Sequence, residues 1–430
     1  MIKKIVFVFT ASFLSLVSFS QEIDKIINAT EVEKIESTLS SDEMAGRKTF
    51  SPEIDKAAEL IANEFEKNKL QFLGNSNSYF QEFSMIKTKP LQSLLLLNSD
   101  TVAADKYFVY TTSTQLNYTS TEGFEIVNIG KNDNYSKSIQ SSIGAKKNTL
   151  VLIDTSYANR LKRLQGFLSA ARFASPNQII FIVTAITNPV NFKLDATNEI
   201  SVQQLKNVVG ILPGKTSDKK GEYVIFSGHY DHLGIGKPNT DRDSIYNGAN
   251  DDAAGTTAVM MLSRYFSTIK NNERSIIFVA FTAEEIGGFG SQYFSRQLNE
   301  DSVVAMFNIE MIGTESKWGT NSAYITGYEK SDMGKILQGN LTGSKFHFEP
   351  DPYPEQNLFY RSDNATLAAL GVPAHTISTS KMDSEKFYHT QDDEIETLDM
   401  NNMAEIIKAI AISSQSIISG RDTPTRVKKD

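Results

Sequence analysis

The motifs YVIFSGHYDHLG (residues 223–234) and NGANDDAAG (residues 247–255) define the part of the chain around which the rest is built. In the first motif an apolar run ends at a histidine and an aspartate, and in the second a pair of aspartates precedes a helical pattern. Imidazole nitrogens and carboxylate oxygens are ligands that zinc accepts. The two motifs therefore predict a buried strand, a helix and part of a site for a divalent cation.

Strands and helices alternate from residue 204 to the end of the chain. The run SIIFVAF at residues 275–281 is apolar throughout, as expected of a strand buried on both faces. The other predicted strands span residues 208–212, 223–227, 303–309, 322–326 and 375–378, and the predicted helices span residues 255–269, 330–339, 365–370 and 402–419. This alternation predicts an α/β fold with a mixed, mostly parallel central sheet flanked by helices.

A main domain is predicted from residues 21–97 and 201–430, interrupted by a small inserted subdomain at residues 98–200. Before the insertion, helices are expected at residues 23–39 and 51–67 and strands at residues 80–85 and 93–97. The second of these helices begins with Ser51 as its expected N-cap and Pro52 at its first position.

The insertion is expected to hold a strand, a helix and a strand at residues 149–153, 158–171 and 178–183. Loops rich in Ser, Thr and Asn are expected around them, at residues 112–118 and 132–142. The insertion contains no histidine and no clustered acids, so an accessory role is favoured over a second active site.

Composition limits the classes of partner. The 430 residues are 40% apolar and 22% charged, which is typical of a globular protein. The formal net charge of -8 argues against nucleic acid, because phosphate binding requires clustered Lys and Arg. Since the chain has no cysteine, any metal must be held by His, Asp or Glu.

Residues 1–20 are typical of a signal peptide. Lys3 and Lys4 precede an apolar run at residues 5–19, and the small residues Ser18 and Ser20 favour cleavage there. The run is shorter than the roughly 20 residues that a membrane-spanning helix needs, although an uncleaved anchor is the alternative. We therefore expect a periplasmic or secreted protein with no membrane span after removal of the signal peptide.

Five residues outside the insertion are candidate metal ligands: His229, Asp251, Glu285, Glu310 and His389. Two imidazoles and three carboxylates suffice for two cations if one carboxylate bridges them. Several of these residues follow predicted strands, at the edge where ligands bind in open α/β sheets. Glu284, next to Glu285, is then free to take a proton from water.

Each of these assignments has a structural alternative. Glu284 and Glu285 could be solvated surface residues, although they closely follow a buried strand. Asp251 and Asp252 could cap the helix that follows, and Asp252 is preferred for that role. The three remaining histidines are interpreted as structural: His232, His347 and His375.

The motifs GHYDHLG, GANDDAAG, FTAEEIGGFGS, NIEMIG and FYHTQDD, in this order, resemble the co-catalytic zinc exopeptidase family of secreted bacterial aminopeptidases. The resemblance covers most of the chain outside the insertion and includes the opening LSSDE with Gly46 and Arg47. It implies the zinc exopeptidase fold and two Zn²⁺ per chain. The insertion resembles the protease-associated subdomain of some exopeptidases but lacks its usual glycines.

By this resemblance, Asp251 bridges the two zinc ions. His229 and Glu310 complete the first site, and Glu285 and His389 complete the second. The family more often has aspartate where this chain has Glu310, and the longer side chain affects how the carboxylate meets the metal.

The resemblance also implies roles beside the metals. Glu284 is the general base, and Asp231 orients the imidazole of the first site through its second ring nitrogen. Arg361 and Asp363 lie in a segment that shapes the pocket for the substrate's amine. Tyr388 could donate a hydrogen bond to the developing oxyanion, with core packing as the alternative.

The expected function is an exported metallo-aminopeptidase that acts on peptides with a free N-terminus. A glutaminyl cyclase with a single zinc is an alternative on the same scaffold, and a carboxypeptidase or dipeptidase is another. A non-catalytic binding domain is disfavoured because such relatives usually lose a ligand or the base.

Overall fold

The computed structural model describes residues 22–429, so the predicted signal peptide lies outside the described residues. The described part divides into two compact units. Within the described residues, the main unit consists of residues 22–82 and 205–429, and the inserted unit spans Phe83–Gln204. These boundaries lie outside the expected 98–200, because the strands that enter and leave the insertion extend far beyond their apolar cores.

The main unit is built on a sheet whose central strands are parallel neighbours. They are β12 (Ser275–Phe281), β9 (Tyr223–His229), β13 (Val303–Ile309) and β16 (Ala374–Ser378). On one side of these four strands β8 (Phe192–Leu212) is antiparallel to β12, and on the other side β14 (Ser322–Ile325) is antiparallel to β16 and parallel to β15 (His347–Pro350). The predicted mixed, mostly parallel sheet is confirmed.

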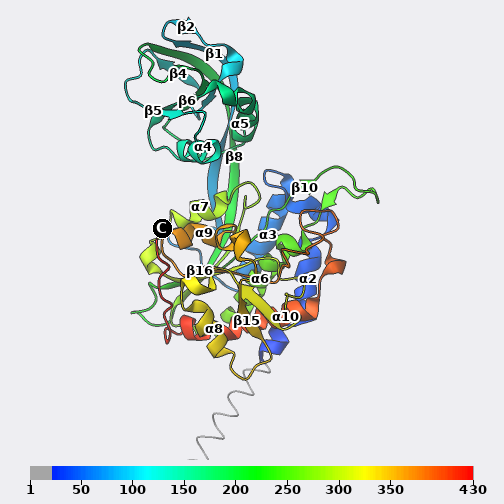
Figure 1. The fold of residues 1–430 in the computed structure, drawn as a ribbon. Coiled ribbons are helices and arrows are strands. Elements are labelled where there is room, and N and C mark those ends of the chain that lie inside the picture. Colours follow the sequence, from blue (N-terminus) through cyan, green and yellow to red (C-terminus); the bar gives the residue numbers. More distant parts are fainter. Residues whose placement is uncertain (1–21, 430) are drawn as a thin grey trace, which may run out of the picture. The chain divides into compact units, whose positions relative to one another are not determined.

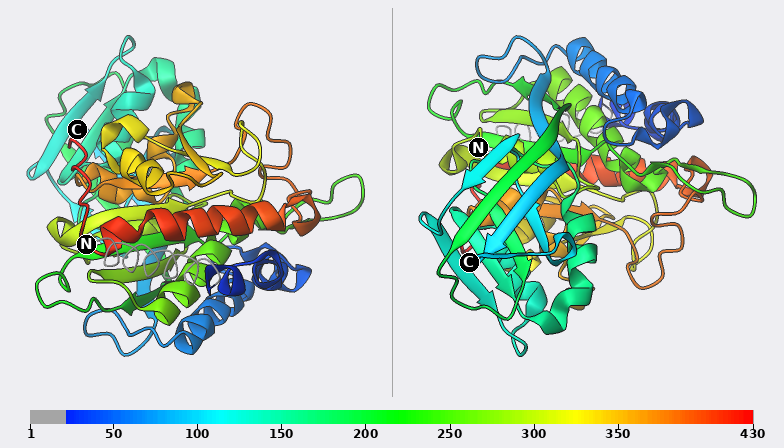
Figure 2. Two further views of the ribbon diagram at one scale, coloured as in Figure 1. Left: turned by 90° about the horizontal axis from the view of Figure 1, so that it is seen from below. Right: turned by 90° about the horizontal axis from the view of Figure 1, so that it is seen from above.

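Helices flank this sheet (Figure 1). They are α2 (Ala29–Leu39), α3 (Pro52–Lys67), α6 (Ala254–Ile269), α7 (Phe289–Ser295), α8 (Met333–Asn340), α9 (Asn364–Ala369), α10 (Met400–Ser413) and α11 (Gln415–Ile418). The left view of Figure 2 shows α10, in red, running beside α6 and the blue α2, and these three helices contact one another. A short ribbon of β10 (Gly234–Ile235) and β11 (Ile245–Tyr246) lies between the two opening motifs.

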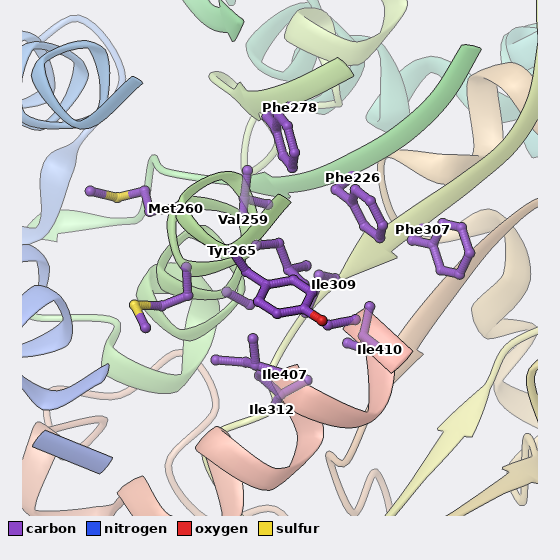
Figure 3. Packing of buried hydrophobic residues seen from close by; sticks show 14 of the residues in the cluster. Phe226, Val259, Met260, Tyr265, Phe278, Phe307, Ile309, Ile312, Ile407 and Ile410 are labelled. Atoms are coloured by element: carbon purple, nitrogen blue, oxygen red, sulfur yellow. The ribbon is translucent and has the colours of Figure 1, made fainter. Parts of the chain in front are cut away.

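The core fixes the position of β9. Val224 and Phe226 belong to the hydrophobic core shared with α6, whereas Ile225 belongs to a second core, as the alternation of side chains along a strand requires. Phe226 stacks on the rings of Phe278 and Phe307 from the flanking strands, with centroids 5.8 and 4.9 Å away (Figure 3). The end of β9 is thereby held firmly.

Several elements differ from the sequence prediction at their ends. The helix expected from residue 23 is broken, and α2 begins at Ala29 with the Asn28 side chain accepting a hydrogen bond from the Glu31 amide. Ser51 occupies the N-cap position of α3, but within residues 22–429 its hydroxyl makes no capping bond. The helix expected at residues 402–419 is divided into α10 and α11.

The inserted unit has its own sheet, in the order β3 (Tyr107–Tyr110), β7 (Ile179–Val183), β6 (Asn148–Ile153) and β5 (Phe124–Ile129). α5 (Leu161–Leu168) lies between β6 and β7 in the chain, as predicted. The segments expected as loops instead contain β4 (Gln115–Tyr118) and α4 (Tyr135–Ile143), whose apolar residues are too sparse to reveal them. The two strands expected at residues 80–85 and 93–97 are one long strand, β1 (Phe80–Leu97), which pairs with β2 (Asp100–Thr101).

Across the described residues of both units, no helix combines the length and the apolar character needed to cross a membrane.

Candidate metal centre

The carboxyl ends of β9, β12 and β13 meet at one edge of the sheet, because the three strands are parallel neighbours. β9 ends at His229, β12 is followed by Glu284 and Glu285, and β13 is followed at once by Glu310. Ala283, just before the two glutamates, has a φ of 60°, a left-handed conformation that non-glycine residues seldom adopt. This conformation turns the chain after β12 and brings the side chains of Glu284 and Glu285 to the edge where β9 and β13 also end.

Asp251 lies between two histidines. Its Oδ1 is 3.2 Å from Nε2 of His229, and its Oδ2 is 3.2 Å from Nε2 of His389. The same nitrogen of His389 is 3.2 Å from Oε2 of Glu285, and Glu310 groups with His229 and Asp251. The structure therefore brings all five predicted ligands together, in two adjacent groups that share Asp251.

Buried donor atoms in these groups are left without partners. In the described part of the chain, His229 Nε2, Glu285 Oε1 and Glu310 Oε2 make no hydrogen bond. Buried polar atoms normally find a partner, because leaving them unpaired costs free energy. Nitrogen and oxygen atoms that converge in this way fit a pair of zinc ions, which would satisfy them.

The electrostatics of the centre also favour bound cations. Burial raises the pKa of Glu284 well above its usual value and raises that of Glu310 to about 7. For His389, burial opposes protonation, but the contacts with Asp251 and Glu285 outweigh it and raise the pKa to about 10. Buried carboxylates at this density repel one another, and divalent cations would neutralise them.

Asp231 fixes the loop that carries the two glutamates. Its carboxylate accepts hydrogen bonds from the backbone N–H groups of Glu284 (3.1 Å) and Glu285 (3.3 Å) and from the hydroxyl of Thr49 (3.0 Å). The ring Nδ1 of His229 lies 3.0 Å from the Asp231 carbonyl oxygen and 3.8 Å from its carboxylate. The contact with the second ring nitrogen is therefore made by the backbone carbonyl of Asp231 and not by the expected carboxylate, which the two amides engage.

Asp252 ties three segments of the centre together. One oxygen accepts from the backbone N–H of Gly255 in the first turn of α6 and also from that of Met311, each at 3.0 Å, although the N-cap position of α6 is Ala253 rather than the expected Asp252. The other oxygen accepts from the backbone N–H of His229 at 3.1 Å. Asp252 thus links the ends of β9 and β13 to the start of α6.

Asp393 was not predicted to belong to the centre. Its two oxygens accept hydrogen bonds from the backbone N–H groups of Asn250 (2.8 Å) and Asp251 (3.0 Å). It therefore holds the backbone of the shared ligand in place. The sequence signal was its position four residues after His389, in the acidic end of FYHTQDD.

His232, interpreted from the sequence as structural, also lies in the centre. It is 1% exposed, and its Nδ1 is 2.7 Å from Oε1 of Glu285. Together with Asp251 and Glu285 it forms a group of potential metal ligands. Its spacing of three residues from His229 was the signal that could have identified it.

A cleft opens over the two groups and is lined by Asp251, Glu284, Glu310 and His389, among others. Tyr388 lines it too, with 37% of its surface exposed and its ring stacked 3.9 Å from that of His389.

The structure separates the two residues of the Arg361 segment. Arg361 is exposed and lines the cleft. Asp363 is 2% exposed and lies in the interior, where burial raises its pKa to about 6. Only the first of them is placed to meet a substrate directly.

Part of the chain matches a family model, and two curated proteins are similar to it. Residues 207–413 match the model of peptidase family M28. Aminopeptidase YwaD of Bacillus subtilis (strain 168) is 22% identical over 53% of this chain and 48% of its own length. Leucine aminopeptidase 1 of Penicillium rubens is 29% identical over 47% of this chain and 53% of its own length. The chain thus spans about half the length of these curated relatives.

The fold is similar to that of a solved structure, an aminopeptidase from Aneurinibacillus sp. strain AM-1. The two chains share 17% identity, with 95% of this chain and 97% of the other covered, at a TM-score of 0.54. At this identity the likeness concerns the fold.

Proposed function

The chain carries a peptidase family M28 domain, and on that premise we propose that it is a metallo-aminopeptidase that removes the N-terminal residue of peptides. The observation that carries the proposal is the position of Asp251, shared by two groups of ligands beneath a cleft that Glu284 also lines. The names of the two curated relatives, both aminopeptidases, support the same activity.

The chain would hold two zinc ions. His229 and Glu310 would bind one, Glu285 and His389 the other, and Asp251 both. When bound, the ions would supply Lewis acidity, which polarises the scissile carbonyl and lowers the pKa of water.

Glu284 is the proposed general base. It lines the cleft, where burial raises its pKa well above the usual value, and a carboxyl group beside the reacting water can act as a general base. Its carboxylate would take the proton of the attacking water and return it to the leaving amine. The Asp231 carboxylate, bonded to the Glu284 amide, holds the base in position for both steps.

Cleft residues would orient the substrate. The Tyr388 hydroxyl, partly exposed beside His389, would donate a hydrogen bond to the oxygen of the scissile carbonyl as negative charge develops on it. Carboxylates around the second metal position would hold the free α-amino group. Arg361 would contact the peptide at the wall of the cleft. The leader-like residues 1–20 support the further proposal that the protein acts after export.

A panel of aminoacyl and N-blocked chromogenic peptides, each with and without a chelator, tests this function. We expect cleavage of the free peptides and little cleavage of the blocked ones, with activity lost on chelation and restored by zinc. Equal rates on blocked and free peptides would contradict the aminopeptidase proposal. Cyclisation of N-terminal glutamine without hydrolysis would indicate a glutaminyl cyclase instead.

A further inference from the structure

His232 stands beside the second group of ligands with both ring nitrogens uncommitted. Within residues 22–429 neither nitrogen makes a hydrogen bond, although the side chain is buried. Nδ1 lies 2.7 Å from Oε1 of Glu285 and 3.9 Å from Oδ2 of Asp251. Oε1 of Glu285 also lacks a hydrogen bond. His232, Asp251 and Glu285 together offer ligand atoms that all lie within 4.8 Å of one another, close enough to face one cation.

The surroundings hold the His232 ring in this position. Its backbone N–H donates to the carbonyl of Arg47 at 3.2 Å. A Cβ at Gly248 would lie 2.5 Å from Cδ2 of the imidazole, so a glycine is required there. The two oxygens of Glu285 face one imidazole each, Oε1 that of His232 and Oε2 that of His389. The backbone hydrogen bond and the close approach of Gly248 therefore fix the position of the His232 imidazole.

We propose that His232 is a fourth protein ligand of the second metal position, together with Asp251, Glu285 and His389. The inference rests on the metal centre of the proposed function. Zinc accepts four nitrogen and oxygen ligands, so these residues would complete a closed set. The first position has only His229, Glu310 and the shared Asp251, and keeps room for water or substrate. The second ion should therefore be held more tightly than the first.

When cobalt(II) replaces zinc, the histidines that coordinate the metal can be counted directly by NMR. The exchangeable ring proton of each coordinated histidine gives a separate, strongly shifted NMR signal in the cobalt protein. The chain has five histidines. His375 is bonded to Thr326 and Ser331, and His347 is exposed, so neither should contribute. We expect three such signals from the wild-type chain carrying two cobalt ions.

The variant His232→Gln should show two signals, and the matched control His347→Gln should keep three. In competition with a chelator, His232→Gln should weaken one of the two zinc affinities by more than ~100-fold, beyond the usual effect of losing a residue that only orients a ligand. The other affinity should stay nearly unchanged. If the variant does not fold, the wild-type count still decides the question.

Two shifted signals from a wild-type chain with two ions bound would overturn the role of His232 and leave the proposed function standing. A wild-type chain that binds no cobalt would overturn the metal centre, and the proposed function with it. The two failures are therefore distinguishable in one experiment.

Discussion

Glu284 and Glu285 are adjacent in the chain but have opposite environments. Glu285 contacts two imidazoles, and although burial opposes ionisation, these contacts lower its pKa. Burial raises the pKa of Glu284, and that side chain lines the cleft. Two carboxyl groups whose surroundings drive their pKa values apart suit different tasks, one as a ligand and the other as a proton carrier.

Replacement of Glu284 by glutamine tests this division. The Glu284→Gln variant should keep its full metal content, because the side chain is not assigned to a metal, while kcat falls by at least ~100-fold, the contribution usual for a general base. Metal analysis and steady-state kinetics on the same preparation check both expectations.

The control is Glu59→Gln, at an exposed position on α3, which should change neither quantity. Near-normal turnover in Glu284→Gln would remove this residue from the reaction. Loss of metal in the same variant would make it a ligand.

At the scale of elements, Arg47 connects the N-terminal segment to both opening motifs. The side chain is fully buried, and its guanidinium donates hydrogen bonds to the backbone carbonyls of Leu39, Tyr230, Asn247 and Gly248. The segment around Arg47 thereby becomes part of the support beneath the candidate metal centre.

Glu36 provides a pH test of how α2 packs on α6. It is fully buried, accepts a hydrogen bond from the Thr257 hydroxyl at 2.8 Å, and has its pKa raised by burial from 4.5 to about 8. The folded state binds the proton of the Glu36 carboxyl group more tightly than the unfolded state does. The resulting contribution to the free energy of unfolding is therefore complete below pH 4.5 and is lost as the pH rises toward 8. The loss should be on the order of 2–5 kcal/mol.

Melting temperatures of wild type and Glu36→Gln across this pH range measure the effect. In acid, the melting temperature of Glu36→Gln should be equal to or below that of the wild type. As the pH rises, the melting temperature of the variant should increase steadily relative to that of the wild type. Glu33→Gln, at an exposed position of the same helix, should follow the wild type. A constant difference between wild type and Glu36→Gln would show that Glu36 does not titrate in this range.

At the scale of the whole molecule, the sequence predicted best what depends on local pattern. The strands at residues 275–281 and 303–309 match the structure residue for residue, because continuous apolar runs of that length are typical of buried strands. The positions of Glu284 and Glu310 followed from the ends of these two strands. The long strands β1 and β8 were missed over most of their length, since many of their residues are exposed and polar.

What the sequence could not supply were contacts between distant segments. The bonds from Asp393 to the amides of Asn250 and Asp251 join residues about 140 positions apart, a separation at which no local pattern operates. The spacing of His232 from His229 pointed toward the centre, but only the fold shows that Glu285 approaches it. Five candidate metal ligands could be named from motifs, but which of their atoms converge depends on the fold.

The central claim is that the fold gathers these ligands into a centre for two metals that share Asp251. Zinc analysis of the purified chain, after removal of loosely bound ions, tests it most directly. We predict two zinc ions per chain in the wild type, loss of both in Asp251→Ala, and two in the control Asp241→Asn, at an exposed position of the preceding turn. A wild-type chain with a single zinc ion, or an Asp251→Ala variant that keeps both, would contradict the account.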